Sequence, residues 1–180
     1  MKQIKIHDKE FKLYLPYEKI RAVVEKMAEQ MNSDLAGKNP LFVCILNGSF
    51  MFAAELFKRI ELLESEISFV KLASYNGERT SGAVKELIGL NEEIKGRTVV
   101  ILEDIVDTGI TIDNILKQLA KKEPKEVLIA TLLFKPEALQ KEIPLHYVGL
   151  EIPNDFIVGY GLDYDGYGRN LIDIYSVINN

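Results

Sequence analysis

The chain has a single cysteine and lacks any apolar run long enough to cross a bilayer. A disulfide within one chain needs two cysteines, so the composition favours a reducing compartment, and Cys44 is best interpreted as a small core residue. The first residues also lack the apolar stretch of a secretory signal. We therefore expect a cytoplasmic protein that does not bind membranes.

Positive charge is also in short supply. The 180 residues include 22 lysines and arginines against 27 aspartates and glutamates, which gives a formal net charge of −5. Non-specific binding to nucleic acid or to an anionic membrane requires a basic face, so we expect neither as a partner. If the ligand is anionic, local groups, helix ends or a metal must hold it.

Two common phosphate-binding patterns are absent. No stretch matches the GxxxxGK[ST] pattern of P-loop proteins, and no early strand is followed by the GxGxxG pattern of dinucleotide-binding folds. The stretch Gly159-Tyr160-Gly161 is followed by the wrong spacing. Any phosphate site must therefore be built in another way.

What the chain does contain is an alternation of strand-like and helical patterns. With 47% hydrophobic and 27% charged residues it has the composition of a globular protein, and its length fits one domain, residues 1–180. The periodicity predicts helices at 16–31, 49–60 and 110–119. It predicts strands at 4–6, 11–15, 41–46, 67–72, 84–88, 99–102, 127–134 and 147–150, the first two forming a hairpin.

Strands that alternate with helices and are apolar on both faces predict an α/β fold, with a parallel sheet flanked by helices. In such sheets the ligand lies beyond the carboxyl ends of the strands. Four polar segments directly follow a predicted strand and are expected to meet at that edge: Asn47-Gly48, Ser74-Tyr75, 103–111 and Lys135. The polar stretch 74–82 has two glycines and is typical of a mobile loop.

The stretch VILEDIVDTGIT carries the strongest chemical signal. Backbone N–H groups at the expected helix start, with the hydroxyls of Thr108 and Thr111, can cradle a phosphate monoester. Gly109 permits close approach of the backbone. Glu103 and Asp104 could accept hydrogen bonds from sugar hydroxyls or hold Mg²⁺, which prefers oxygen ligands. The competing interpretation is that the acids only complement the helix dipole.

At this point the chain resembles a known family. VVILEDIVDTGITI is similar to the signature of the type I phosphoribosyltransferases, which bind 5-phosphoribosyl-1-pyrophosphate. The I-V-D-T-G form, with Asp104 and Asp107 bracketing two aliphatic residues, resembles the purine-salvage branch, the hypoxanthine-guanine phosphoribosyltransferases. The segments LNGSFMF, ASYNG, LLFKP and PNDFIVGYGLDYDGYGR match in the same order, so the resemblance runs from about Leu41 to Arg169. It implies a parallel sheet flanked by helices, with a small hood built from the terminal segments.

The resemblance also implies an activity. The enzyme would transfer the 5-phosphoribosyl group from phosphoribosyl pyrophosphate to N9 of hypoxanthine or guanine, giving IMP or GMP and pyrophosphate, with Mg²⁺ as cofactor. Asp107 would be the general base that takes the proton from N7 of the purine. The ribose and 5′-phosphate would be bound by Glu103, Asp104, Asp107, Thr108, Gly109, Ile110 and Thr111. The metal would be held by Glu103, Asp104 and Asp163.

The remaining substrate groups also have matching residues. Pyrophosphate would be bound by Asn47, Gly48, Ser74, Tyr75 and Arg169, with a cis peptide before Asn47 and a closing loop at Ser74-Tyr75. The purine would be bound by Lys135, which donates to its 6-oxo group, by the stacking ring of Phe156, and by Ile157 and Asp163. The chain departs from the family pattern at Asn47, where relatives often have lysine, and at Gly168, where they usually have an aromatic residue. The ending RNLIDIYSV is also unusual.

Two other functions remain open. One is a xanthine-preferring phosphoribosyltransferase, and the other is a regulatory protein on the same fold that senses nucleotides and binds RNA or DNA. The acidic composition and the combination of Asp107, Lys135 and Phe156 favour the enzyme. The expected partners are therefore small molecules, phosphoribosyl pyrophosphate and a 6-oxopurine. The resemblance further implies a homodimer or homotetramer.

Overall fold

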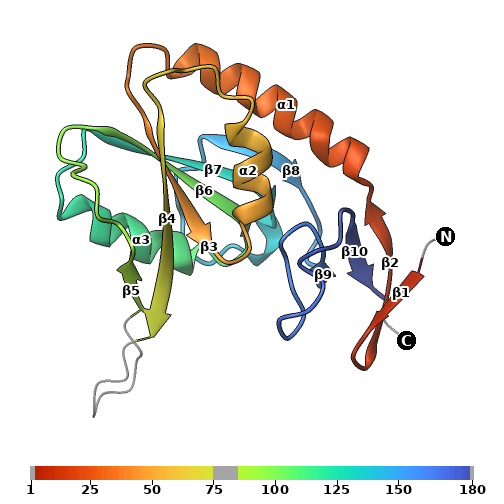
Figure 1. The fold of residues 1–180 in the computed structure, drawn as a ribbon. Helices are drawn as coiled ribbons and strands as arrows, with labels where there is room; N and C mark the ends of the chain where they lie inside the picture. The colour runs from red at the N-terminus through yellow and green to blue at the C-terminus, as the bar shows by residue number, and fades with distance from the viewer. Residues whose placement is uncertain (1–2, 75–84, 179–180) are drawn as a thin grey trace, which may run out of the picture.

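The computed structural model describes residues 3–74 and 85–178, whose strands form two sheets (Figure 1). The larger sheet has the order β5-β4-β3-β6-β7-β8. Its strands are β3 (Leu41–Leu46), β4 (Glu66–Ser74), β5 (Lys85–Ile88), β6 (Thr98–Val106), β7 (Glu126–Phe134) and β8 (Tyr147–Glu151). All neighbours pair in parallel except β4 and β5, which are antiparallel. The α/β fold is confirmed.

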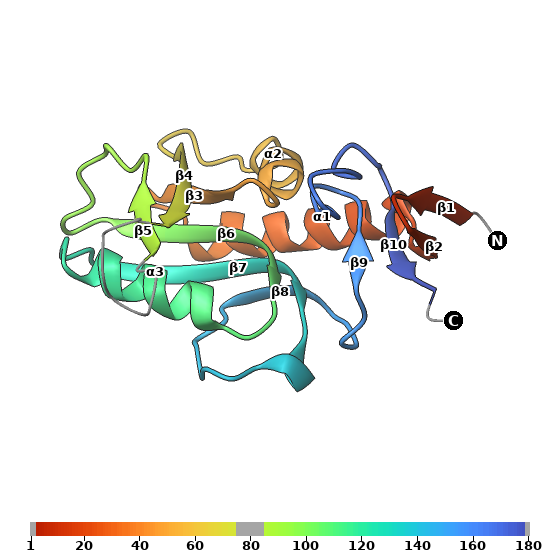
Figure 2. The same ribbon diagram turned by 90° about the horizontal axis from the view of Figure 1, so that it is seen from below.

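Helices cover both faces of this sheet (Figures 1 and 2). They are α1 (Tyr17–Asp34), α2 (Phe50–Phe57) and α3 (Ile110–Ala120). Along β3 the side chains alternate: Phe42 and Cys44 belong to the core under α1 and α2, whereas Leu41 and Val43 belong to the core under α3. This is why β3 is apolar at every position. Cys44 is fully buried, as expected of a core residue.

The smaller sheet is the hood. It consists of β1 (Gln3–Ile6), β2 (Lys9–Leu15), β9 (Ile157–Val158) and β10 (Ile174–Val177), all antiparallel, in the order β1-β2-β10-β9. Figure 2 shows it to one side of the larger sheet. Its own small core contains Phe11, Val158 and Tyr175. The predicted N-terminal hairpin and the hood built from terminal segments are therefore confirmed.

Four details differ from the expectations. The edge strand β5 is antiparallel, since only residues 75–84 separate it from β4 and a parallel crossover needs about a dozen or more. The strand set also continues past residue 150, because β9 and β10 are too short to produce a periodic pattern. The second helix ends at Phe57, and Ile60 lies in the turns that follow. Strand β6 continues beyond Leu102 to Val106, because its pairing with β7 continues.

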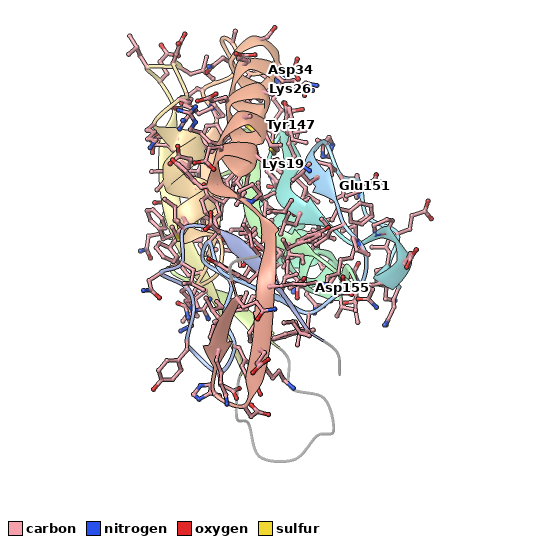
Figure 3. The ribbon with its side chains drawn as sticks, turned by 90° about the vertical axis from the view of Figure 1, so that its right-hand side faces the viewer. Lys19, Lys26, Asp34, Tyr147, Glu151 and Asp155 are labelled. Atoms are coloured by element: carbon pink, nitrogen blue, oxygen red, sulfur yellow. The ribbon has the colours of Figure 1, made fainter. Side chains whose placement is uncertain are left out.

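Helix α1 packs against the edge strand β8 (Figure 3). The hydroxyl of Tyr147, the first residue of β8, donates a hydrogen bond to Oδ2 of Asp34, the last residue of α1, at 3.3 Å. Burial raises the pKa of Tyr147 to about 12. This contact joins the start of the edge strand to the end of the longest helix. Within residues 3–74 and 85–178, no helix is both long and apolar enough to span a membrane.

Candidate active site

Two carboxylates lie inside a core strand. Glu103 and Asp104 belong to β6, so the expectation that both follow the strand is wrong; the sheet continues past them. Glu103 is only 8% exposed, and burial, followed by the charge of Asp104, raises its pKa well above the usual range. Burial also raises the pKa of Asp104 to about 6, although hydrogen bonds from backbone N–H groups, including that of Ile105 at 2.8 Å, oppose the shift. Carboxylates inside a sheet whose surroundings raise their pKa values are typical of a functional site.

The residues after β6 form a loop that leads into α3. Gly109 occupies the N-cap position with a φ of +78°, and its carbonyl accepts the N–H of Asp113 at 3.0 Å. A pocket of 260 Å³ opens here and is lined by Glu103, Asp104, Ile105, Val106, Asp107, Thr108, Gly109, Thr111 and Ile112. The pocket lies at the start of α3, where the first N–H groups of a helix lack intrahelical partners, and such a position suits an anion. The geometry fits the phosphate cradle predicted for this loop.

The segment at residues 140–141 packs against this loop and forms hydrogen bonds with it. The carbonyl of Thr108 accepts the N–H groups of Gln140 and Lys141, at 3.0 and 3.1 Å. A Cβ on Gly109 would come within 2.8 Å of the carbonyl oxygen of Lys141. Glycine is therefore required at position 109 for two reasons, its left-handed φ and the close approach of Lys141.

The turn after β3 lies directly beside the acids. The peptide between Leu46 and Asn47 is cis, as the resemblance implies. A Cβ on Gly48 would overlap Oδ2 of Asp104, and a Cβ on Gly161 would overlap the carbonyl oxygen of Gly48. The turn is thus enclosed between β6 and the loop 159–169 that leads from β9 towards β10. Only glycine at both positions allows this approach.

The guanidinium group of Arg169 binds to other residues of its own loop. Its Nη1 donates to the carbonyl of Gly161 at 2.7 Å, and its Nη2 pairs with Oδ1 of Asp163, also at 2.7 Å. The other carboxylate oxygen of Asp163 accepts the N–H of Gly166 at 2.7 Å. Both residues lie near enough to affect Asp104, because Arg169 lowers its pKa and Asp163 raises it. The structure therefore brings these two expected site residues to the acids, but bound to each other.

Lys135 lies beside the loop that follows β6. It follows β7 directly, is 7% exposed, and its N–H donates to the carbonyl of Val106 at 2.9 Å. Its Nζ lies 3.9 Å from Oδ2 of Asp107, whose side chain is 47% exposed. A buried ammonium needs a nearby opposite charge, and Asp107 supplies it. The cation and the expected general base thus face the same space.

The expected purine-stacking ring is in the hood. Phe156 is 43% exposed, and its ring contacts those of Phe11 and Tyr164, with centroids 6.2 and 5.6 Å away. The next residue, Ile157, is buried in β9 and pairs with Ser176 of β10. The hood therefore presents one partly open aromatic face.

Some expected residues take less part in this arrangement. Ser74 ends β4, and Tyr75 with the rest of the predicted loop lies outside the described residues. Ile110 is 43% exposed and does not line the pocket. Within the described part of the chain, no three histidine, cysteine, aspartate or glutamate side chains form a group that could hold a metal.

Sequence reasoning missed Gly161 and Tyr164. The signal was present in GYGLDYDGYGR, where four glycines have positive φ. Such a density of glycines indicates a loop whose backbone makes close contacts.

The chain is similar to known phosphoribosyltransferases over most of its length. The family model for the phosphoribosyl transferase domain matches residues 14–165. A hypoxanthine-guanine phosphoribosyltransferase of Streptococcus pneumoniae is 42% identical over 161 residues, 89% of each chain. One of Streptococcus agalactiae is 43% identical over 148 residues, 82% of each chain.

Solved structures agree. The crystal structure of a hypoxanthine phosphoribosyltransferase from Staphylococcus aureus has a TM-score of 0.85 and 36% identity, covering 93% of this chain and 91% of that one. A hypoxanthine-guanine phosphoribosyltransferase from Bacillus anthracis also has a TM-score of 0.85, with 33% identity and coverage of 95% and 100%. With a family model and relatives matched over most of its length, this chain belongs to the phosphoribosyltransferase family.

Proposed function

We propose that this chain transfers the 5-phosphoribosyl group of phosphoribosyl pyrophosphate to N9 of hypoxanthine or guanine, giving IMP or GMP and pyrophosphate. The observation that carries the proposal is the 3.9 Å separation between Nζ of Lys135 and Oδ2 of Asp107. A donor that could bind a base thus lies next to a carboxylate of the loop that could bind a sugar phosphate, which supports a reaction between these two substrates. The names of the relatives support the same activity.

The sugar phosphate is assigned to the loop. N–H groups at the start of α3, with the hydroxyls of Thr108 and Thr111, bind the 5′-phosphate. Glu103 and Asp104 accept hydrogen bonds from the ribose hydroxyls. Positive charge develops on the sugar as the bond from C1 to pyrophosphate breaks, and nearby carboxylates stabilise it.

The base is assigned to the space between Lys135 and Phe156. The Nζ of Lys135 donates to the 6-oxo group, the ring of Phe156 stacks on the purine, and Ile157 and Asp163 contact its edge. As N9 forms its bond to C1, the proton on N7 passes to the carboxylate of Asp107. Pyrophosphate leaves with the electron pair of the broken bond.

The leaving group is assigned to the turn after β3 and the residues facing it. The amides of Asn47 and Gly48 bind pyrophosphate, together with Ser74, Tyr75 and Arg169. Arg169 already carries two partners, Asp163 and the carbonyl of Gly161, so its contact with pyrophosphate requires it to share or leave them.

The described acids do not form a complete metal site by themselves, so the proposal is a magnesium ion that binds together with the substrate. Mg²⁺ keeps several waters and is usually bound through one or two carboxylates plus substrate phosphates. Glu103, Asp104 and Asp163 offer only oxygen donors, which is the chemistry that this ion prefers. When bound, the metal would neutralise charge on the leaving pyrophosphate.

The proposal extends to the protein's setting. We assign it one domain over residues 1–180, a cytoplasmic location and a homodimeric or homotetrameric state, with small-molecule partners only. Its test is a spectrophotometric assay of hypoxanthine, guanine, xanthine and adenine, each with phosphoribosyl pyrophosphate and Mg²⁺. Transfer to hypoxanthine or guanine is the expected result. No transfer to either base would overturn the proposal, and faster transfer to xanthine would redirect it to the xanthine-preferring enzyme.

A further inference from the structure

Among the described residues, two aromatic side chains contact the ring of Phe156. Phe11 of β2 is fully buried and meets it at a tilt of 44°, with centroids 6.2 Å apart. Tyr164 meets it edge to face, at 5.6 Å and 80°. Tyr164 also contacts Phe11, at 6.2 Å, so the three rings form one cluster. Edge-to-face contacts favour one relative orientation of the rings, and the remaining 43% of Phe156 stays open to a ligand.

A tight turn fixes the backbone of Tyr164. The N–H groups of Tyr164 and Tyr167 each donate to the other's carbonyl, at 2.9 and 3.0 Å. The two residues between them, Asp165 and Gly166, both have positive φ, at +49° and +85°. This is the Asp-Gly hairpin turn in which both central residues are left-handed. The turn follows Asp163 directly, so the position of the Tyr164 ring is tied to the proposed site.

The N-terminal hairpin holds the far end of the same ring. The hydroxyl of Tyr164 donates to Oδ1 of Asp8 at 2.7 Å. This hydrogen bond lowers the pKa of Asp8 and raises that of Tyr164, as expected when the carboxylate is the acceptor. The ring of His7 contacts the edge of Tyr164 at 5.6 Å, and Nζ of Lys9 lies 5.5 Å above it. Three consecutive residues, two in the hairpin turn and the first of β2, thus contact one tyrosine.

We propose that Tyr164 is a positioning residue for the purine: it holds Phe156 in its stacking orientation, and the turn of the N-terminal hairpin holds Tyr164 through Asp8. The inference rests on the proposed function and extends it. It makes the hairpin at residues 3–15 a part of the base site, although no residue of that hairpin is assigned a contact with substrate. Its distinguishing consequence is a larger effect on the purine than on phosphoribosyl pyrophosphate. Of the residues assigned to phosphoribosyl pyrophosphate, only Arg169 shares the loop of Tyr164, and its contacts there are with Asp163 and Gly161.

The test measures KM for hypoxanthine and for phosphoribosyl pyrophosphate separately. Tyr164→Leu removes the edge contact and should raise KM for hypoxanthine by roughly 2- to 12-fold, the range expected for one aromatic pair. KM for phosphoribosyl pyrophosphate should change less. Tyr164→Phe keeps the ring contact and removes only the hydrogen bond to Asp8, so it should raise the KM for hypoxanthine by less than Tyr164→Leu does. Tyr167→Leu makes the same change at the other end of the turn, where the ring contacts His7 and not Phe156, and should match the wild type.

The role of Asp8 is tested in the same assay. Asp8→Ala and Tyr164→Phe each remove the same hydrogen bond, so the double variant should raise KM for hypoxanthine no more than either single variant. If Tyr164→Leu fails to fold, Asp8→Ala decides, since a rise confined to the hypoxanthine KM supports the inference and no rise overturns it. Equal rises in both KM values for Tyr164→Leu would also overturn it. An active wild type with an unaffected Tyr164→Leu overturns this inference alone, whereas an inactive wild type overturns the proposed function as well.

Discussion

Gly48 packs directly against the carboxylate of Asp104, with no room for a side chain between them. A Cβ on Gly48 would overlap Oδ2 of Asp104, while Gly161 encloses the turn from the other side. Gly48 is not among the glycines with positive φ, so its backbone would accept alanine and only the space forbids it. The proposed pyrophosphate turn and the proposed ribose acids therefore cannot move independently.

Replacing Gly48 with alanine should displace either the turn or Asp104. We expect kcat/KM for phosphoribosyl pyrophosphate to fall by roughly 10- to 100-fold, since a shift of about 1 Å in a reacting group has effects of this size. Gly37→Ala is the matched control: nothing lies within 4 Å of the added Cβ, although its φ of +71° makes alanine strained. It should lose about 1 kcal/mol of stability with normal kinetics. Wild-type kinetics in Gly48→Ala would contradict this coupling.

Asp107→Asn should lower kcat by about 10²- to 10⁴-fold, the range for loss of a general base. Binding of phosphoribosyl pyrophosphate should remain, because the N–H groups of the loop are unchanged. Asp113→Asn serves as the control, since this acid lies in the first turn of α3 but pairs with Lys117 at 2.6 Å. Steady-state kinetics of both variants provide the measurement. Turnover of Asp107→Asn within a factor of two of the wild type would remove Asp107 from the mechanism.

The architecture could be predicted because its pattern is local and strong. The run at 41–46 is apolar at every position, which occurs when both faces of a strand are buried, and the structure confirms it. Strand β6 was harder to delimit, because Glu103 and Asp104 look like the end of a strand. The sheet tolerates them there only because pairing with β7 continues past their positions. Carboxylates inside the sheet, rather than hydrophobicity, mark this part of it as a candidate site.

The contacts between distant segments could not be predicted in the same way. The positions of Gly48, Asp104 and Gly161 in the chain do not indicate that the three touch. The pairing of Arg169 with Asp163 depends on the turn between them, whose glycines fix the direction of the chain. Likewise, Asp8 and Tyr164 are 156 residues apart and meet only because the hood joins both ends of the fold. Periodicity describes elements, not the packing between them.

Activity should require a divalent cation. The described residues that line the pocket at the end of β6 include three carboxylates and no lysine or arginine. A trianionic or tetraanionic substrate would therefore bind poorly without a counter-ion. Excess chelator should abolish transfer, and added Mg²⁺ should restore it. Full turnover in metal-free buffer would contradict the assignment of these acids.

Asp104 should make the free protein less stable as pH rises. Burial raises its pKa from 3.8 to about 6, so between these values the folded protein keeps a proton that the unfolded chain has released. Stability must then fall as pH rises through this window, and the full cost is present above it. Asp104→Asn should remove both the cost of burying this carboxylate and its repulsion of Glu103. The free energy of unfolding at pH 7.5 should therefore increase by up to about 3 kcal/mol.

Urea denaturation at pH 4.5 and pH 7.5, with chelator and without substrate, measures this difference. Glu137→Gln, a change at an exposed acid, should follow the wild type. If Asp104→Asn is no more stable than the wild type at pH 7.5, burial of this carboxylate does not oppose folding. The variant should nevertheless lose activity, which would separate the stability of the site from its function.

The final prediction concerns the base that is refused. The ammonium of Lys135 offers only donors, and the side chain is 7% exposed. A 6-oxopurine presents an acceptor to it, whereas adenine presents an amino group, so a donor would face a donor. Sites built on such a hydrogen bond can discriminate by about 10⁴-fold or more. We therefore expect transfer to hypoxanthine or guanine and not to adenine.

Lys135→Met keeps the length of the side chain and removes its charge. It should reduce kcat/KM most for hypoxanthine and shrink the gap to adenine, because stacking on Phe156 favours neither base. Lys141→Met, at an exposed lysine of the following segment, should leave the ratio as it is. The ratio of kcat/KM for the two bases is measured in the wild type and both variants. An unchanged ratio in Lys135→Met, or a wild type that uses adenine as readily as hypoxanthine, would show that another group reads the 6-position.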